Sequence, residues 1–378
     1  MLSTIKASFY IFVLSFLTFT INAQLAGQWP PVDKPPPPNA DWTKLVDQTK
    51  VPAIAQSKNE NDCSAKGDVC NWSCTNCVRT TDIIQCPNKY DWGLSFDDGP
   101  TEFTPTLLDY LESQNITLTF FVIGSRVIEN PQTLQRAVAA GHQIAVHTWS
   151  HTALTTQSNE EIIAEIKWTE TAIKQAVGLT PKYMRPPYGN IDDRVRGILT
   201  QLGYKVVIWD KDTNDWMSGE PGNTFQLPWI EGNFTEWVKE NDPTGHISLE
   251  HDLYKQTAAQ APNVVPIVQG AGFTIKPVFQ CVGDAQPYLE STTTAPATDP
   301  AAAPATDPAT DPAAAPATDP ATDPAVAPAT DPVTPTSNVQ YVDGSPSAIP
   351  TTSNAISHMI NNNYLLLLVL FTLWLFKL

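Results

Sequence analysis

The sequence predicts an α/β protein in which parallel strands and helices alternate, as in a wound sheet or a (β/α) barrel. Three observations between residues 86 and 285 support this fold class. Short β-rich runs alternate with longer helical patterns, several helical patterns end at a glycine, and polar residues follow directly after the strands. In such folds, functional residues collect where strands end and loops begin.

The predicted strands are short, and most are separated by one helical segment. They cover residues 92–96, 118–123, 143–146, 182–184, 205–209, 246–249 and 273–275. The predicted helices cover residues 104–113, 131–140, 159–177 and 192–202, and the glycines that end them are Gly141, Gly178 and Gly203. A helix between two strands implies that these strands run parallel.

Composition excludes some partners. The chain has 378 residues, with 39 acidic against 22 basic residues and a formal net charge of −17. Because phosphate neutralisation needs clustered Lys and Arg, the acidic balance argues against a nucleic-acid partner and against a polyanionic substrate. A neutral or cationic partner remains open.

The first 23 residues resemble a secretory signal peptide. Lys6 precedes an apolar run through Phe19, and Ala23 supplies the small residue at the expected cleavage site. The apolar run is short for a membrane span, so a retained N-terminal anchor is the weaker alternative.

Residues 24–85 form a Pro-rich leader with a cysteine cluster. The six cysteines are Cys63, Cys70, Cys74, Cys77, Cys86 and Cys281. A secreted chain favours disulfides over free thiols, and five cysteines before the main block and one after it require a bridge across that block. We expect this bridge to be Cys86–Cys281, with two more inside residues 63–77. A zinc site built from the four cysteines of 63–77 is the alternative.

Titratable residues follow five of the strands. They are Asp97 and Asp98, His147 and His151, Arg185, then Asp210, Asp212 and Asp215, and finally His251. Asp97 to Pro100 could form an ordinary turn, and a single histidine is usually structural. Two histidines at i and i+4 can share one side of a helical turn, and with a carboxylate they form a two-His, one-carboxylate set that leaves room for water.

These motifs resemble, in order, those of the polysaccharide deacetylases of carbohydrate esterase family 4, the NodB homology domain. The matching segments are Ser95–Pro100, His147-x-x-x-His151, Arg185–Gly189, Asp212-x-x-Asp215-Trp216 and Leu249-x-His251. The resemblance covers residues 86–281, and the context is most similar to the fungal GPI-anchored chitin deacetylases. Ser95 stands where the family usually has Thr. The resemblance implies a distorted (β/α) barrel. The leader and the C-terminal residues 286–353 lie outside the resemblance.

The resemblance also implies the roles of the metal ligands and proton carriers. Asp98, His147 and His151 would hold a divalent metal, most often Zn²⁺, with Co²⁺ as the alternative. Asp97 would be the general base and His251 the general acid.

Five further residues would support the reaction. Arg185 would orient Asp97, and Asp215 would raise the pKa of His251. The backbone N–H of Tyr188 would stabilise the oxyanion, and Trp216 and Leu249 would line the acetyl pocket.

The implied activity removes N-acetyl groups from chitin, giving chitosan and acetate. Two alternatives remain open at this point. A deacetylase of another acetylated glycan, such as peptidoglycan or xylan, shares every residue named. A non-catalytic, wall-anchored glycan-binding protein is the second, although it would be expected to lack the base or the acid.

The C-terminal part predicts a stalk and a lipid anchor. Residues 286–353 contain repeated Ala-Pro-Ala-Thr-Asp-Pro units, which cannot form a core and favour an extended, disordered stalk. Residues 354–378 combine a polar spacer with an apolar tail, the pattern of a GPI-anchor signal, with Ser353 as the expected attachment site. A retained tail-anchored helix is the alternative.

The expected location is therefore the cell surface or cell wall, with the membrane reached only through the GPI lipid. We expect a monomer. Sequons begin at Asn71, Asn115 and Asn233, and they predict exposed, N-glycosylated loops.

Overall fold

The computed structural model describes residues 24–65 and 69–290. The predicted signal peptide, the repeats of the stalk, the GPI signal and Ser353 lie outside the described residues. All described residues belong to one of the two units into which the chain divides, Met1–Asp299. Within the described part of the chain, no helix is both long and apolar enough to cross a membrane.

The described strands form one parallel sheet. They are β1 (Asp91–Asp97), β2 (Thr119–Val122), β3 (Gln143–Val146), β4 (Tyr183–Met184), β5 (Lys205–Val206), β6 (Lys211–Asp212), β7 (His246–His251) and β8 (Thr274–Ile275). The order is β5-β4-β3-β2-β1-β7-β6, with β8 also pairing with β1. Each ladder is parallel, which confirms the predicted α/β class. The sheet runs from β5 at one end to β6 at the other, as a distorted, incomplete barrel.

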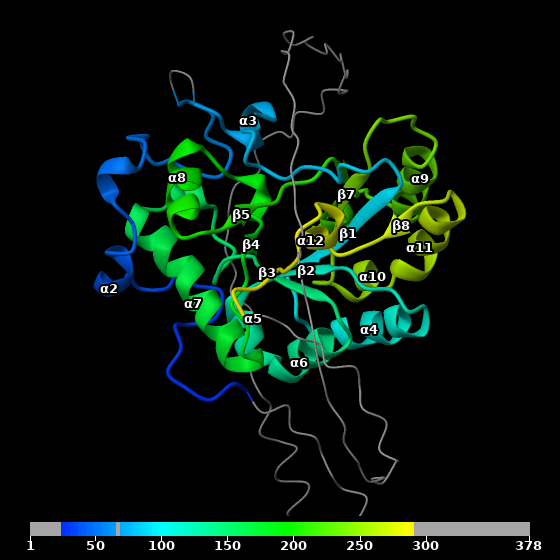
Figure 1. The fold of residues 1–378 in the computed structure, drawn as a ribbon, viewed down its shortest axis with the longest axis horizontal. Helices are drawn as coiled ribbons and strands as arrows, with labels where there is room; N and C mark the ends of the chain where they lie inside the picture. Colours follow the sequence, from blue (N-terminus) through cyan, green and yellow to red (C-terminus); the bar gives the residue numbers. More distant parts are fainter. Residues whose placement is uncertain (1–23, 66–68, 291–378) are drawn as a thin grey trace, which may run out of the picture. The chain divides into compact units, whose positions relative to one another are not determined.

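Helices flank the sheet on both sides (Figure 1). The four predicted helices are present as α4 (Thr104–Ser113), α6 (Pro131–Ala139), α7 (Asn159–Val177) and α8 (Asp193–Gln201). Local sequence sets the limits of α7, because Ser158 and Glu161 form a capping box and Gly178 ends the helix in the left-handed conformation.

Several elements were not predicted. They are β6, α2 (Ala40–Thr43), α3 (Trp72–Thr75), α5 (Gly124–Glu129), α9 (Pro228–Trp237), α10 (Lys255–Ala258), α11 (Ala261–Gly270) and α12 (Val278–Cys281). In the two longest, Gly232 lies inside α9 and Pro266 inside α11, and both residue types weaken a helical pattern. The predicted strand 205–209 is also shorter, ending at Val206.

The central strand β1 is buried along its whole length. Its apolar residues Trp92, Leu94 and Phe96 are at most 1% exposed, and α-helices cover the sheet on both faces. The sequence of β1 alternates these apolar residues with Gly93 and Ser95, and both faces of the strand are buried. This strand therefore delivers its last residue, Asp97, to a rigid position at the edge of the sheet.

The leader packs against the main block instead of standing apart from it. The Leu25 N–H donates to the Ile128 carbonyl at 2.7 Å. The ring of Trp29 stacks on that of Trp149 with centroids 6.0 Å apart. At the other end, Tyr288 is buried and Glu290 pairs with Lys174. The predicted start of the stalk at residue 286 is therefore wrong, because the packed fold continues to residue 290.

The cysteines form three disulfides. The pairs are Cys63–Cys74, Cys70–Cys77 and Cys86–Cys281. All six cysteines of the sequence lie among the described residues and none is free. The alternative of a four-cysteine zinc site is therefore wrong, because its thiols are consumed in covalent bonds.

Candidate metal and catalytic site

The end of β1 places two carboxylates at the edge of the sheet. Asp97 is in register with Phe121 on β2 and with His251 on β7, so the topology itself brings the base and acid candidates together. The chain then turns at Asp98, which has φ 80°. The next residue is Gly99, where a Cβ would collide with the carboxylate of Asp252.

The two histidines of the second motif lie in an irregular loop after β3. The expectation of a helical turn is wrong here, because Thr148 and His151 adopt left-handed backbone conformations with φ 65° and 59°. Those two turns still bring the rings together, with centroids 5.0 Å apart for His147 and His151.

A buried carboxylate holds this loop in shape. Glu165 on α7 is fully buried and accepts hydrogen bonds from the backbone N–H groups of Trp149, at 2.7 Å, and Ser150, at 2.9 Å. It also accepts the hydroxyl of Ser150 at 2.6 Å. Burial raises the pKa of Glu165, against the lowering effect of these hydrogen bonds. The residue lies two turns into a helical pattern, where the sequence alone suggests an ordinary exposed glutamate.

Asp98, His147 and His151 form the candidate metal centre. Among the described residues, they bring three ligand atoms within 4.8 Å of one another. Asp98 Oδ1 lies 3.5 Å from His147 Nε2 and 3.3 Å from His151 Nε2. This oxygen is buried and has no hydrogen-bond partner, so its position suits an electropositive ligand. One carboxylate and two imidazoles fit a divalent metal ion that keeps open positions for water and substrate.

The other ring nitrogens orient the two imidazoles. His147 Nδ1 lies 2.8 Å from the backbone carbonyl of Arg185, and His151 Nδ1 lies 3.2 Å from the hydroxyl of Tyr188. A hydrogen bond at Nδ1 directs Nε2 towards Asp98, which is the usual arrangement around a metal-binding histidine. Burial lowers the pKa of His151 to about 4, so this imidazole is neutral and available as a ligand at physiological pH.

Asp97 forms a buried ion pair with Arg185. Arg185 Nη1 donates to Asp97 Oδ1 at 2.7 Å and to the hydroxyl of Ser95 at 2.9 Å. The guanidinium is fully buried and lies over the ring of Phe121, with its central carbon 4.0 Å from the ring centroid. A charge-assisted hydrogen bond of this kind orients the carboxylate.

His251, the last residue of β7, forms a second charge pair. Its Nδ1 lies 2.6 Å from Asp215 Oδ1, and its backbone N–H donates to Asp215 Oδ2 at 2.9 Å. Burial by itself would lower the pKa of His251, but the charge and hydrogen bond of Asp215 outweigh it and raise the pKa to about 10. The imidazole is therefore charged at neutral pH and able to donate a proton.

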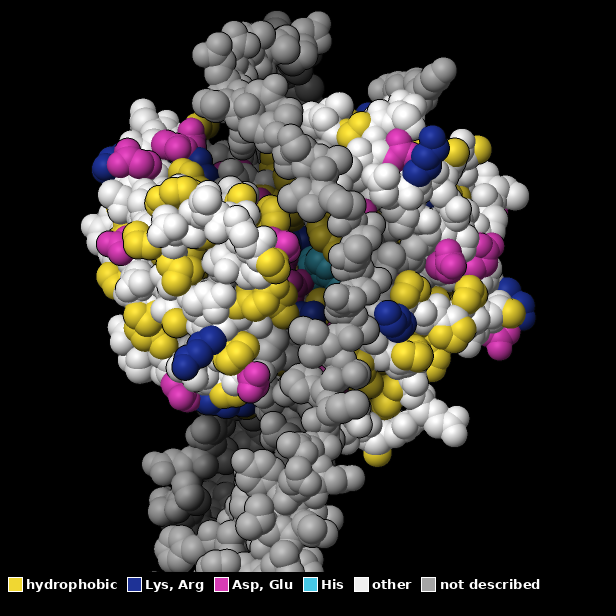
Figure 2. Space-filling model, turned by 180° about the vertical axis from the view of Figure 1, so that it is seen from behind, with side chains coloured by type: hydrophobic (Ala, Val, Ile, Leu, Met, Phe, Trp, Pro, Cys, Tyr) yellow, Lys and Arg dark blue, Asp and Glu magenta, His cyan; other side chains and the backbone are white. Residues whose placement is uncertain are grey.

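These groups share one cavity of about 530 Å³. Tyr188, Trp216 and Leu249 line it together with Asp97, Asp98 and His251. Trp216 is 43% exposed and Tyr188 is 54% exposed, whereas Leu249 is buried. Figure 2 shows a histidine side chain at the bottom of a hollow, with acidic and hydrophobic side chains beside it.

Sequence reasoning missed residues that contact this site but lie far from its motifs along the chain. Arg126 on α5 donates through Nη1 to the backbone carbonyl of Asp98 at 2.8 Å. Trp72 on α3, from the cysteine cluster, lines the cavity with Glu60, Asn61 and Ser73. None of these residues lies in the five deacetylase motifs, and the cavity connects segments that are far apart in the chain.

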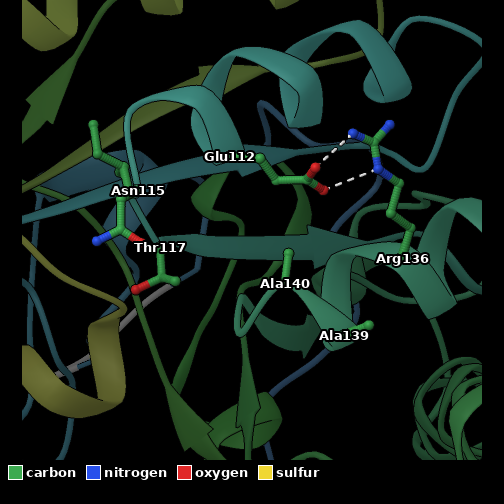
Figure 3. A pocket seen from close by; sticks show the side chains of 7 residues that line it. Glu112, Asn115, Thr117, Arg136, Ala139 and Ala140 are labelled. Atoms are coloured by element: carbon green, nitrogen blue, oxygen red, sulfur yellow. Dashed lines mark hydrogen bonds and ion pairs between the residues drawn. The ribbon is translucent and has the colours of Figure 1, made fainter. Parts of the chain in front are cut away.

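A separate hollow contains one of the sequons. Asn115 and Thr117 line it, and Arg136 crosses it to pair with Glu112 at 2.9 Å (Figure 3). Asn115 is exposed in the turn after α4, as expected.

The expectation of exposed loops is wrong for the other two sequons. Asn71 is only 7% exposed, and its side-chain oxygen accepts the hydroxyl of Ser73 at 2.9 Å. Asn233 lies inside α9 and is half-buried.

Known proteins share this fold and sequence. The sequence profile of the polysaccharide deacetylase family matches residues 85–207. Chitin deacetylase 1 of Cryptococcus neoformans is 42% identical over 305 residues, which cover 75% of this chain and 65% of that protein. The chain thus spans slightly less than two thirds of that relative's length.

Two further relatives match over most of their own length. Chitin deacetylase 1 of Saccharomyces cerevisiae is 34% identical over 265 residues, covering 70% of this chain and 82% of that protein. The solved structure of the chitin deacetylase from Colletotrichum lindemuthianum superposes with a TM-score of 0.51 at 32% identity, over 56% of this chain and 96% of that one. With the five motifs gathered at one edge of a parallel sheet and relatives matched over most of their length, this chain belongs to the polysaccharide deacetylase family.

Proposed function

We propose that this protein is a metal-dependent deacetylase that hydrolyses the N-acetyl groups of chitin, releasing acetate and leaving glucosamine units. The observation that carries the proposal is the shared cavity, in which a buried carboxylate-and-two-imidazole set lies beside an Arg-paired carboxylate and an Asp-paired histidine. Such an arrangement supplies a Lewis-acid site, a base and an acid around one small volume.

The choice of chitin rests on the relatives and on the cavity. The fungal relatives that match at 34–42% identity carry the name chitin deacetylase. Aromatic residues line the cavity, and aromatic faces pack well against the apolar faces of uncharged sugar rings.

We infer Zn²⁺ as the metal, with Co²⁺ as the alternative, held by Asp98, His147 and His151. Nitrogen and carboxylate donors in this number are typical of catalytic zinc sites. When bound, the ion would polarise the acetyl carbonyl and lower the pKa of a water molecule towards neutrality.

Asp97 would take the proton of the attacking water. Its second oxygen, Oδ2, lies 3.7 Å from His147 Nε2, so the carboxylate is next to the ligand set without belonging to it. Arg185 occupies Oδ1 and leaves Oδ2 for the proton.

His251 would donate a proton to the amine nitrogen as the carbon–nitrogen bond breaks, since its pKa is raised to about 10 by Asp215 in spite of burial. The backbone N–H of Tyr188 would stabilise the developing oxyanion. Trp216, in the turn that follows β6, and Leu249, on the neighbouring strand β7, would enclose the acetyl methyl group.

Acetate release is the direct test. We expect the purified protein to release acetate from chitin oligomers, to lose this activity with a chelator and to regain it with Zn²⁺. Asp97→Asn should abolish the reaction while leaving the ligand set intact. Activity that survives both treatments would refute the mechanism.

The same assay separates the alternatives. Release from acetylxylan or peptidoglycan in preference to chitin would favour the other glycan deacetylases. Binding of chitin without acetate release from any of the three substrates would favour a wall-anchored glycan-binding protein.

We also propose that the protein is secreted and acts as a monomer on the outer face of the membrane or in the cell wall. Three disulfides indicate an oxidising compartment. The sequence pattern of residues 354–378 supports a GPI anchor, and the exposed Asn115 supports N-glycosylation there. Release of the protein from membranes by a phosphatidylinositol-specific phospholipase tests the anchor.

A further inference from the structure

The cysteine cluster forms a compact unit beside the candidate active site. We call residues 59–65 and 69–77 the disulfide module; it contains α3 and the bridges Cys63–Cys74 and Cys70–Cys77. The module lies outside residues 85–207, the segment that matches the family profile.

Hydrogen bonds fix the module to the loop after β4. The side-chain amide of Asn190 donates to the Glu60 carbonyl at 2.9 Å and to the hydroxyl of Ser73 at 3.2 Å. The backbone N–H of Trp72 donates to the backbone carbonyl of Ile191 at 3.1 Å. These bonds reach the segment that directly follows Arg185–Gly189, so the module and that catalytic loop are held together.

Trp72 is the side chain that joins the module to the site. Its ring lies against Gly189, where any Cβ would collide with it, and edge-to-face on Trp209 with centroids 4.6 Å apart. Trp209 in turn lies 5.4 Å from the guanidinium of Arg185. Gly189 has φ 61° and Tyr188 has φ 59°, so the backbone turn on which the indole packs is in the left-handed conformation. A turn of this kind is strained at Tyr188 and depends on the packing of neighbouring side chains.

The module also faces the cavity directly. Glu60, Asn61, Trp72 and Ser73 line the same 530 Å³ cavity as Asp97 and His251. Trp72 is partly exposed, and Asn61 and Ser73 are exposed. An aromatic face beside exposed amide, carboxylate and hydroxyl groups matches a sugar ring, which offers an apolar C–H face and a rim of hydroxyl groups.

We propose that the disulfide module forms one wall of the glycan-binding groove and that Trp72 binds a sugar ring next to the unit that is deacetylated. This inference rests on the proposed function, since it assigns a substrate position to that site. Trp72 is then a specificity residue that favours oligomers long enough to reach the module. The two disulfides hold Trp72 at the required distance from the unit that is deacetylated.

The test compares short and long substrates. We expect Trp72→Ala to raise the KM for the N-acetylglucosamine hexamer about tenfold, the effect of losing one well-packed aromatic contact. The KM for the dimer should change much less. Trp72→Phe should retain most of the preference for the hexamer. Trp229→Ala is the matched control, because Trp229 is a half-exposed tryptophan on α9 that does not line the cavity.

Folding and catalysis are separated by two further measurements. Asn61→Ala removes an exposed side chain of the groove and should weaken hexamer binding without changing the melting temperature. Calorimetry of hexamer binding to the inactive variant Asp97→Asn, with and without Trp72→Ala, measures the contribution of Trp72 to affinity independently of turnover.

The outcomes are distinct. If wild-type protein releases no acetate but binds the hexamer and loses affinity in Trp72→Ala, the inference stands and the proposed function fails. Equal losses for dimer and hexamer, or unchanged hexamer binding in both module variants, would overturn the inference.

Discussion

The His251–Asp215 pair gives a sharp prediction about pH dependence. Replacing Asp215 by asparagine keeps the size of the side chain but removes the negative charge 2.6 Å from His251 Nδ1. Burial lowers the pKa of His251, and Asp215 supplies the two strongest influences that raise it. Without that charge, the pKa should fall from about 10 to its ordinary value of 6.5 or below.

The magnitude follows from this difference. The interval between 10 and 6.5 corresponds to about 5 kcal/mol in favour of the protonated imidazole. A general acid works only when protonated, so its activity falls as pH rises through its pKa. In Asp215→Asn, the protonated fraction at pH 8.5 would be about 1%, whereas about half remains at pH 6.5. The loss of activity should therefore be about fiftyfold greater at pH 8.5 than at pH 6.5.

The assay is the initial rate of acetate release from chitin oligomers, recorded as kcat/KM between pH 5 and pH 10. A matched control involves His246, at the other end of β7 from His251. Asp210 contacts His246 Nδ1 at 2.7 Å and accepts from the backbone N–H of the next residue, Ile247, at 2.7 Å, a similar Asp–His pair outside the cavity. Asp210→Asn should leave the pH at which kcat/KM falls on the alkaline side unchanged. An unchanged alkaline limb in Asp215→Asn would refute the assignment of His251 as the acid.

Three further predictions concern the framework of the site. Replacing Cys86 and Cys281 by alanine should lower the free energy of unfolding by about 5 kcal/mol, against about 3 kcal/mol for Cys63 and Cys74, because the closed loops span 195 and 11 residues. Denaturant unfolding without reductant measures both, and an equal effect would contradict the loop-entropy argument. Glu165→Gln should weaken Zn²⁺ binding about tenfold, since the amide nitrogen of glutamine cannot accept the hydrogen bonds that a carboxylate oxygen accepts from the N–H groups and hydroxyl of the histidine loop. Competition with a chromophoric chelator measures this, and unchanged affinity would show that Glu165 does not position the ligands. Wild-type protein stripped of metal should lose acetate release and regain it with Zn²⁺, and activity in the stripped protein would rule out a required metal.

The motifs themselves were predictable from local sequence. Asp97 ends a buried apolar strand, and the paired prolines after Arg185 stop strand pairing there, so both positions follow from short-range pattern. Parallel strands then carry their carboxyl ends to one edge, which is why residues as distant as Asp97 and His251 could be expected together.

Other features depended on long-range contacts that no local pattern encodes. The histidine loop was expected to be helical, but left-handed residues shape it and Glu165, fourteen residues after His151, holds it. Trp72 reaches the cavity only because the leader folds back on the segment that follows β4.

The sequence by itself determined the fold class and placed titratable residues at the strand ends, because strand periodicity and the residues that end each strand are local properties. The roles of metal ligand, acid and base were predicted from the resemblance to the deacetylase family. Only the tertiary structure decided which surfaces enclose those groups. The hydrogen bonds from the histidine loop to Glu165 and the position of Trp72 in the cavity lining act through space over a few ångströms, between segments whose separation along the chain carries no information about their distance.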